Sequence, residues 1–176
     1  MDIKLELPSG EWKKEIIEYK QEIIDNRGAW EGTGCLKSCN VNDFIKNSED
    51  WKNGVNLPKG TVPATEYLAI KQERIVGMVN IRHTIDHPLL SQFGGHIGYQ
   101  VRVSERHKGY CVDILRLALE ECIKMGIDEV LISCNTENTA SRKCILANGG
   151  KYENTVSLKS PKGDEIKIER YWINLK

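Results

Sequence analysis

The chain has 176 residues, of which 40% are hydrophobic and 28% are charged, as is ordinary for a globular protein. Its 25 Lys and Arg residues balance 25 Asp and Glu residues, so the formal net charge is zero. This balance argues against a nucleic-acid-binding protein, which needs an excess of basic residues to neutralise phosphates. The length fits one domain, residues 1–176, with a sizeable core.

The sequence indicates neither a membrane protein nor a metal site. No apolar run approaches the roughly 20 residues that cross a bilayer, and the N-terminus lacks the apolar centre of a signal peptide. We therefore expect a cytoplasmic protein with no membrane partner, whose six cysteines are reduced thiols. Cys35 and Cys39 are loosely spaced and no clustered His completes a ligand set, so we expect no metal.

The first third of the chain combines one strand with helices. Alternating aliphatic residues at 3–7 predict a strand. Ser9 is expected to cap a helix over about residues 11–25, whose apolar positions recur every three or four residues. Residues 28–63 are irregular, apart from a short helix near 42–52, and a long segment of this kind is typical of a functional loop.

Strands dominate from Thr65 onward. In chain order we expect a hairpin of strands 67–70 and 75–82, a strand 96–103, a helix 109–125, a buried strand 130–134, a helix 139–147, and a hairpin of 151–158 and 166–175 around residues 161–164. Strand, helix and strand between His96 and Cys134 make a right-handed βαβ unit in an otherwise antiparallel sheet. The predicted fold class is therefore α+β and not doubly wound.

The segment between the third of these strands and the long helix carries the clearest chemistry. A helix N-terminus presents unpaired N–H groups and partial positive charge, which suit a phosphate. Gly109 permits close approach of the backbone to an anion, while Arg106 and Lys108 add positive charge. On these residues alone, an ordinary helix start with solvated cations is an equal alternative.

Two motifs give the chain a family resemblance. Arg106-His107-Lys108-Gly109-Tyr110-Cys111 resembles the acetyl-CoA signature of the GNAT superfamily, Q/R-x-x-G-x-G/A, with Cys111 in place of the last small residue. Asn138-Thr139-Ala140-Ser141 resembles the family's Asn-x-x-Ser/Ala, and Gly149-Gly150 stands where the family usually has Gly-Phe. The likeness covers about residues 67–152, and the order of elements makes it specific.

The resemblance implies a GNAT-like α+β fold: a mixed, mostly antiparallel sheet of six or seven strands flanked by helices, with one parallel strand pair forming the acetyl-CoA cleft. Acetyl-CoA would be the cosubstrate, without a metal. Backbone groups around Val101 and Val103 would pair with the pantetheine arm, and the N–H groups of residues 107–111 would hold the pyrophosphate. Asn138 would bond the pantetheine, with Ser141 beside it.

Acetyl transfer to an amine needs an oxyanion donor, an acid for the leaving thiolate and a base. The backbone N–H of Val101 is the expected oxyanion donor. Many family members supply the acid as a Tyr, and Ile145 occupies that position here, so that acid is absent. His96 is the predicted base, the alternative being a strand cap or core residue. His83 is a second candidate.

Cys111 lies in the first turn of the long helix, where the helix field and nearby cations favour the thiolate. The alternative is a small packing residue of ordinary pKa. Trp30, Trp51 and acidic neighbours suggest an amine pocket, but nearby lysines favour a solvated loop instead.

The function implied by the resemblance is N-acetyltransfer from acetyl-CoA to a primary amine of a small molecule or peptide. The missing Tyr leaves a second reading open, a non-catalytic acetyl-CoA-binding module of the same fold. A nucleotide-binding regulator would need a P-loop or a triple-glycine motif, and the sequence has neither. The acceptor amine and homodimer formation stay open.

Overall fold

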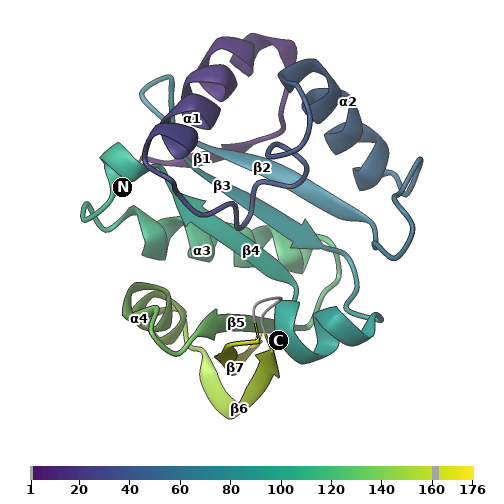
Figure 1. The fold of residues 1–176 in the computed structure, drawn as a ribbon, viewed down its shortest axis with the longest axis vertical. Helices are drawn as coiled ribbons and strands as arrows, with labels where there is room; N and C mark the ends of the chain where they lie inside the picture. Colours follow the sequence, from purple (N-terminus) through teal and green to yellow (C-terminus); the bar gives the residue numbers. More distant parts are fainter. Residues whose placement is uncertain (1, 160–162) are drawn as a thin grey trace.

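Seven strands form two antiparallel sheets in the part of the chain that this computed structural model describes, residues 2–159 and 163–176 (Figure 1). The elements are, in chain order, β1 (Lys4–Glu6), the 3₁₀ turn η1 (Gly10–Trp12), α1 (Lys13–Asp25), α2 (Val41–Lys52), β2 (Ala64–Lys71), β3 (Arg74–Arg82), the short helical turn η2 (Leu90–Gly94), β4 (Ile97–Val101), the 3₁₀ turn η3 (Val103–Glu105), α3 (Tyr110–Lys124), β5 (Glu129–Asn135), α4 (Thr139–Ala147), β6 (Lys151–Lys159) and β7 (Glu165–Asn174). The predicted α+β class is confirmed.

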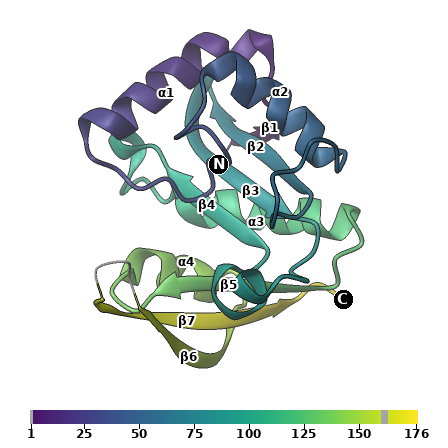
Figure 2. The same ribbon diagram turned by 45° about the vertical axis from the view of Figure 1, so that its right-hand side comes forward.

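The larger sheet has the order β1-β2-β3-β4 and the smaller one the order β5-β7-β6. β4 and β5 are therefore the facing edges of two sheets, and α3 connects them (Figures 1 and 2). The backbone N–H of His96, just before β4, donates to the carbonyl of Leu131 in β5 at 2.7 Å. No ladder joins β4 to β5 among the described residues, so the expected parallel pairing stays a prediction.

Alternation along β2 explains how helices cover both faces of the larger sheet. On one face of β2, Leu68 and Ile70 belong to a core cluster with Phe44 of α2 and with residues of α1. On the other face, Tyr67 belongs to a second cluster that includes Leu115 of α3. Both views show α1 and α2 on one side of this sheet and α3 on the other (Figures 1 and 2). The continuous burial of β2 and β3 follows from this two-sided cover.

Two local expectations are wrong. The strand predicted to reach Val103 ends at Val101, because Arg102 turns its side chain toward α1 and the chain enters the 3₁₀ turn η3. Ser9 makes no side-chain cap; its carbonyl instead accepts from the N–H of Trp12 at 3.1 Å, which closes a 3₁₀ turn before α1. The predicted turn at residues 161–164 lies partly outside the described residues.

Candidate functional site

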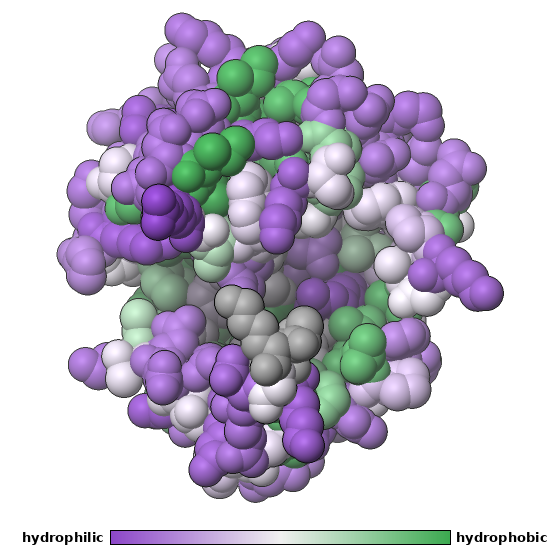
Figure 3. Space-filling model, in the orientation of Figure 1, coloured by the Kyte–Doolittle hydropathy of each residue, from purple (hydrophilic) through white to green (hydrophobic). Residues whose placement is uncertain are grey.

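The two sheets separate from a narrow junction beside His96. A Cβ on Gly95 would lie 2.4 Å from the carbonyl oxygen of Leu131, so only glycine permits this approach, and its φ of 65° is also left-handed. From this junction β4 and β5 diverge without pairing. The surface is hollowed between the part that carries α1 and α2 and the part that carries β5 to β7 (Figure 3).

The open edge of β4 faces the separation. Arg102 donates its N–H to Val76 at 2.8 Å, and the carbonyl of His96 accepts from Arg82 at 2.8 Å, so these residues bond toward β3. Residues at the alternate positions of an antiparallel strand point their N–H and C=O groups the other way. The backbone groups of Tyr99 and Val101 therefore face away from β3, toward β5. This orientation suits the predicted oxyanion donor at Val101.

The loop after β4 is shaped for close approach to its backbone. Gly109 has φ of 80° at the N-terminus of α3 and contributes no side-chain cap, which leaves N–H groups of the first turn for a ligand. His107 is also left-handed, with φ of 63°. Arg106 reaches back to the Val101 carbonyl at 3.5 Å, and Lys108 pairs with Glu105 at 2.7 Å. The positive charge that Lys108 was predicted to offer a phosphate is thus partly neutralised by Glu105.

Tyr110 borders a groove of about 220 Å³ beside this loop, which Lys71, Arg74 and Lys108 also line. The Lys71 ammonium donates to the Tyr110 hydroxyl at 2.9 Å and lies 4.6 Å from the centre of its ring. Basic side chains therefore gather on this flank of the helix start, and this was not foreseen from the sequence.

Helix α1 fixes where the loop begins. Glu22 accepts from the side chain of Arg102 and from the N–H of Ser104, both at 2.7 Å, and Glu15 accepts from Arg102 at 3.0 Å. Arg102 is only 4% exposed. Burial would raise the pKa of Glu22, but the hydrogen bonds from Arg102 and Ser104 outweigh it and lower that pKa. The sequence gives no local signal for these contacts.

On the opposite side, α4 presents Asn138 and Ser141. The Asn138 side-chain oxygen caps α4 by accepting from the N–H of Ser141 at 3.0 Å, so its NH₂ is left to bond another group. The hydroxyls of Ser141 and Tyr99 lie 2.9 Å apart, which links β4 to α4 across the separation. Sequence reasoning missed Tyr99, although it stands two positions before Val101 on the same edge of the strand.

Burial strongly raises the pKa of Tyr99, and neighbouring thiols act in the same direction. One of them, Cys144, donates to the carbonyl of Cys111 at 3.0 Å. A side-chain hydrogen bond between the two thiols, distinct from the one to the carbonyl, lowers the pKa of the half-buried Cys111 more than burial raises it. The direction agrees with the prediction for Cys111, but the cause is a neighbouring thiol and not Arg106 or Lys108.

His96 is 7% exposed, and its Nδ1 accepts from the N–H of Leu131 at 3.0 Å. In a neutral imidazole the proton then sits on Nε2, so the single lone pair is already used. Burial and the charge of Arg82 lower the pKa of His96. This geometry favours the alternative of a structural residue, and the base role stays a prediction. His83 bonds Thr65 at 2.8 Å, and burial lowers its pKa as well.

A buried carboxyl on the α1–α2 face was not foreseen. Glu66 is 3% exposed; Asn80 donates to its Oε2 at 2.9 Å, and its Oε1 has no protein partner in the described part of the chain. Burial raises its pKa well above 4.5. Glu66, Asn80 and Gly98 lie side by side in register across β2, β3 and β4.

The polar groups around Trp51 bond one another, which agrees with the expectation of a solvated loop over that of an amine pocket. Asp50 of α2 accepts from Asn56 at 3.0 Å and pairs with Lys46, and the Trp51 indole donates to the carbonyl of Asn56 at 3.3 Å.

Among the described residues, no group of three or more His, Cys, Asp or Glu side chains could hold a metal. No helix in that part of the chain is long and apolar enough to cross a membrane.

Comparison with known proteins decides the family. The model of the acetyltransferase (GNAT) domain matches residues 29–151, well over half of the chain. The chain belongs to the GNAT family. This GNAT protein therefore acts as an acetyltransferase with acetyl-CoA, and the free β4 edge and the left-handed Gly109 loop fit that cosubstrate. No curated protein sequence matches the chain.

Solved structures share the GNAT fold at low sequence identity. The microcin C7 self-immunity acetyltransferase MccE, in complex with acetyl-CoA and AMP, has a TM-score of 0.70 at 17% identity, covering 98% of this chain and 92% of that one. RimL, a ribosomal L7/L12 α-N-protein acetyltransferase in complex with coenzyme A, has 0.70 at 16%, covering 98% and 93%. Acetyl-CoA-bound YncA from Salmonella typhimurium, a putative acetyltransferase, has 0.68 at 9%, covering 100% and 95%.

Proposed function

We propose that the chain is a cytoplasmic N-acetyltransferase that moves the acetyl group of acetyl-CoA to a primary amine of a small molecule or peptide. The observation that carries the proposal is the Tyr99–Ser141 hydroxyl pair, 2.9 Å apart across the separation between β4 and α4. In this proposal the Tyr99 hydroxyl would be the proton donor, on the strand whose backbone N–H at Val101 would bind the oxyanion.

Val101 and the loop after it would do the binding and charge stabilisation. The N–H of Val101 would receive the negative charge that develops on the thioester oxygen, and such a donor contributes about 3–4 kcal/mol in other enzymes. Backbone N–H groups of residues 107–111 would hold the pyrophosphate, and the side-chain NH₂ of Asn138, which has no partner among the described residues, would bond the pantetheine. Val103 lies in η3 and would not take part as a strand residue.

Tyr99 would protonate the leaving thiolate, in place of the acid missing at Ile145. The phenol is protonated at neutral pH at its ordinary pKa, and burial raises that pKa further, so its part in catalysis depends on position, which the Ser141 hydroxyl 2.9 Å away would help to fix. A positioned general acid contributes about 10²- to 10⁴-fold in rate. Ser141 would act as the positioning residue.

Glu66 would accept the proton of the amine, directly or through water. Burial raises its pKa, which makes the carboxylate a stronger base when it is ionised. It shares a sheet face and a register row with Gly98, whose missing side chain lets Gly32 of the α1–α2 loop pack on β4 at that point. His96 would hold the junction of the two sheets and would not itself move the proton.

The test is a panel of amines with chromatographic measurement of released CoA. The panel includes a polyamine, an amino acid, an aminoglycoside and a peptide with a free N-terminus, the last because RimL is a ribosomal protein α-N-acetyltransferase. Tyr99→Phe should lower kcat about 100-fold while acetyl-CoA affinity changes less than about twofold. Tyr152→Phe, at a 57% exposed tyrosine, is the matched control and should leave kcat unchanged.

Two outcomes would count against the proposal. Acetyl-CoA binding without turnover of any amine would favour the non-catalytic module. An undiminished kcat in a folded Tyr99→Phe variant would place the proton donor elsewhere. Glu66→Gln separates the base from the acid, because it should remove the ascending limb of the pH–rate profile that Tyr99→Phe leaves in place.

A further inference from the structure

The loop between α1 and α2 rests directly on the proposed acceptor side. Gly32 packs so closely on β4 that a Cβ there would lie 2.5 Å from the Cα of Tyr99. A Cβ on Gly34 would lie 2.7 Å from Oε2 of Glu66. Both glycines have positive φ, 70° and 51°, so this path is available to few other residues. The loop therefore covers Glu66, and an amine reaches that carboxyl only where the loop permits it.

Two thiols meet in this loop immediately after Gly34. The sulfur of Cys39 lies 2.9 Å from the carbonyl oxygen of Cys35, to which its S–H donates, and 3.1 Å from Sγ of Cys35. The side-chain amide of Asn47 in α2 lies 3.6 Å from that Cys35 sulfur. The N–H of Cys39 also bonds the carbonyl of Cys35 at 3.2 Å, which makes a single helix-like turn. Positions four apart in such a turn have Cβ atoms about 5–6 Å apart. A disulfide needs Cβ atoms about 3.5–4.5 Å apart, so the turn has to tighten by about 1–2 Å before the two sulfurs can bond.

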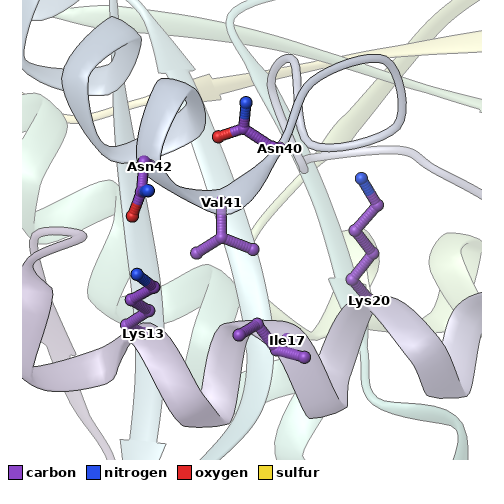
Figure 4. A pocket seen from close by; sticks show the side chains of 6 residues that line it. All are labelled: Lys13, Ile17, Lys20, Asn40, Val41 and Asn42. Carbon is purple, nitrogen blue, oxygen red and sulfur yellow. The ribbon is translucent and has the colours of Figure 1, made fainter.

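The pair lies beside an opening in the surface. Both sulfurs belong to half-buried residues, whereas Cys122 and Cys134 are buried. Lys20 donates to the carbonyl of Cys39 at 2.6 Å and, together with Asn40, lines a groove of about 400 Å³ between α1 and the start of α2 (Figure 4). Because both cysteines are half-buried and not buried, a small oxidant can approach them from solvent.

We propose that Cys35 and Cys39 form a reversible disulfide that fixes the α1–α2 loop over Glu66 and so hinders the acceptor amine. The control of turnover rests on the proposed acetyltransferase function, while the disulfide itself does not. The site is a dithiol modified by a hydroperoxide, and thiols of the cell would restore it.

The chemistry starts at Cys35. Burial and the hydrogen bond to Cys35 raise the pKa of Cys39 to about 12, so Cys39 is the later of the two to react. The sulfur of Cys35 attacks one oxygen of hydrogen peroxide, the O–O bond breaks, and a sulfenic acid and one water result. The Cys39 sulfur then attacks the Cys35 sulfur, the S–O bond breaks, and the departing hydroxide takes the Cys39 proton. Two thiols are oxidised and one peroxide is reduced to two waters.

Trypsin reports this disulfide directly, because Lys37 lies between the two cysteines. Cleavage after Arg27, Lys37 and Lys46 gives peptides 28–37 and 38–46, each with one cysteine. The full chain is treated with hydrogen peroxide, alkylated, digested and mapped by mass spectrometry. We expect the two peptides to stay joined, lighter by two hydrogens than their sum, and to separate after reduction with dithiothreitol.

Cys39→Ser should abolish the joined peptide and leave Cys35 as a sulfenic or further oxidised species. Cys122→Ser, at a buried cysteine, is the matched control and should preserve it. If the folded wild-type chain yields both peptides separately, with both thiols alkylated after peroxide, the proposal is overturned. Oxidation of each cysteine to a sulfinic acid without joining would overturn it as well.

The second measurement concerns the acceptor site. In the oxidised chain the KM for the best amine should rise roughly fivefold or more, while acetyl-CoA affinity stays the same. Cys39→Ser should not respond to peroxide in this assay. A joined peptide with an unchanged amine KM would overturn the control of turnover and leave an oxidation site. A joined peptide in a chain that acetylates no amine would instead refute the proposed function alone.

Discussion

Replacing His96 with Ala separates a structural histidine from a catalytic one. The change leaves the buried N–H of Leu131 without the Nδ1 acceptor that lies 3.0 Å away. An unsatisfied buried donor costs about 1–3 kcal/mol. Taking about 2 kcal/mol, and about 2–4 °C per kcal/mol for a chain of this length, the Tm should fall by about 4–8 °C. His96→Asn is the informative partner, because its amide oxygen can accept from Leu131 but cannot act as a base.

The pH dependence of stability gives an independent measure. The pKa of His96 in the folded chain is below the ordinary 6.5, so below about that pH the unfolded chain binds more protons. The stability of the wild-type chain should therefore decrease as the pH falls through 6.5. Neither variant has the imidazole, so neither shows this loss of stability in acid. The free energy of unfolding of His96→Asn, relative to the wild type, should therefore rise as the pH is lowered.

Urea unfolding and the pH–rate profile with the best amine supply the measurements. We expect His96→Asn to recover most of the stability that His96→Ala loses, and to keep the ascending limb of the rate profile. If His96→Asn is as stable as the wild type but its ascending limb is gone, His96 is the base, and the structural interpretation is refuted.

Three further predictions address the cofactor loop and its support. Gly109→Glu should weaken acetyl-CoA binding about tenfold or more, because a left-handed φ of 80° disfavours a side chain and because the new carboxylate would face the pyrophosphate. Calorimetry that finds an unchanged affinity would refute the assignment of this loop. Cys111 should react with iodoacetamide faster than the buried Cys122, and CoA should shield it; equal labelling with and without CoA would place it away from the cleft. Arg102→Met should lower the free energy of unfolding in urea by about 3–5 kcal/mol, because Glu22 and Glu15 both lose their ion pair with this buried arginine. The loss should shrink in acid as pH falls through the lowered Glu22 pKa, and a loss below about 1 kcal/mol would show the ion pair to be replaceable.

The elements with local signals were predictable from sequence. Asn138 before a short apolar pattern predicted a helix over 139–147, and α4 has those bounds because the cap and the spacing are both local. Gly109 likewise marked the start of α3. The end of β4 was not predictable, because Arg102 turns toward Glu22, a residue 80 positions earlier.

The binding loop was accessible to sequence reasoning and the proton-transfer groups were not. The phosphate loop is contiguous, so a short motif describes it. Tyr99 becomes a candidate acid through its contact with Ser141, which lies 42 positions later in the sequence. Glu66 becomes a candidate base because a loop distant in sequence folds over it and buries it. His96 looked free to act as a base because nothing near it in sequence shows that Leu131 occupies its lone pair.

The order β5-β7-β6 has a consequence for how the protein is made. β7 lies in the middle of the smaller sheet, so β5 and β6 have no common partner until it arrives. A ribosome-bound chain that has emerged only through β6 already carries Tyr99 and the Gly109 loop, but not the sheet that forms the other side of the cleft. Because domains fold as units during synthesis, acetyl-CoA can assist folding only at its last stage. Until then the apolar face of β5 depends on α3 and α4 for cover.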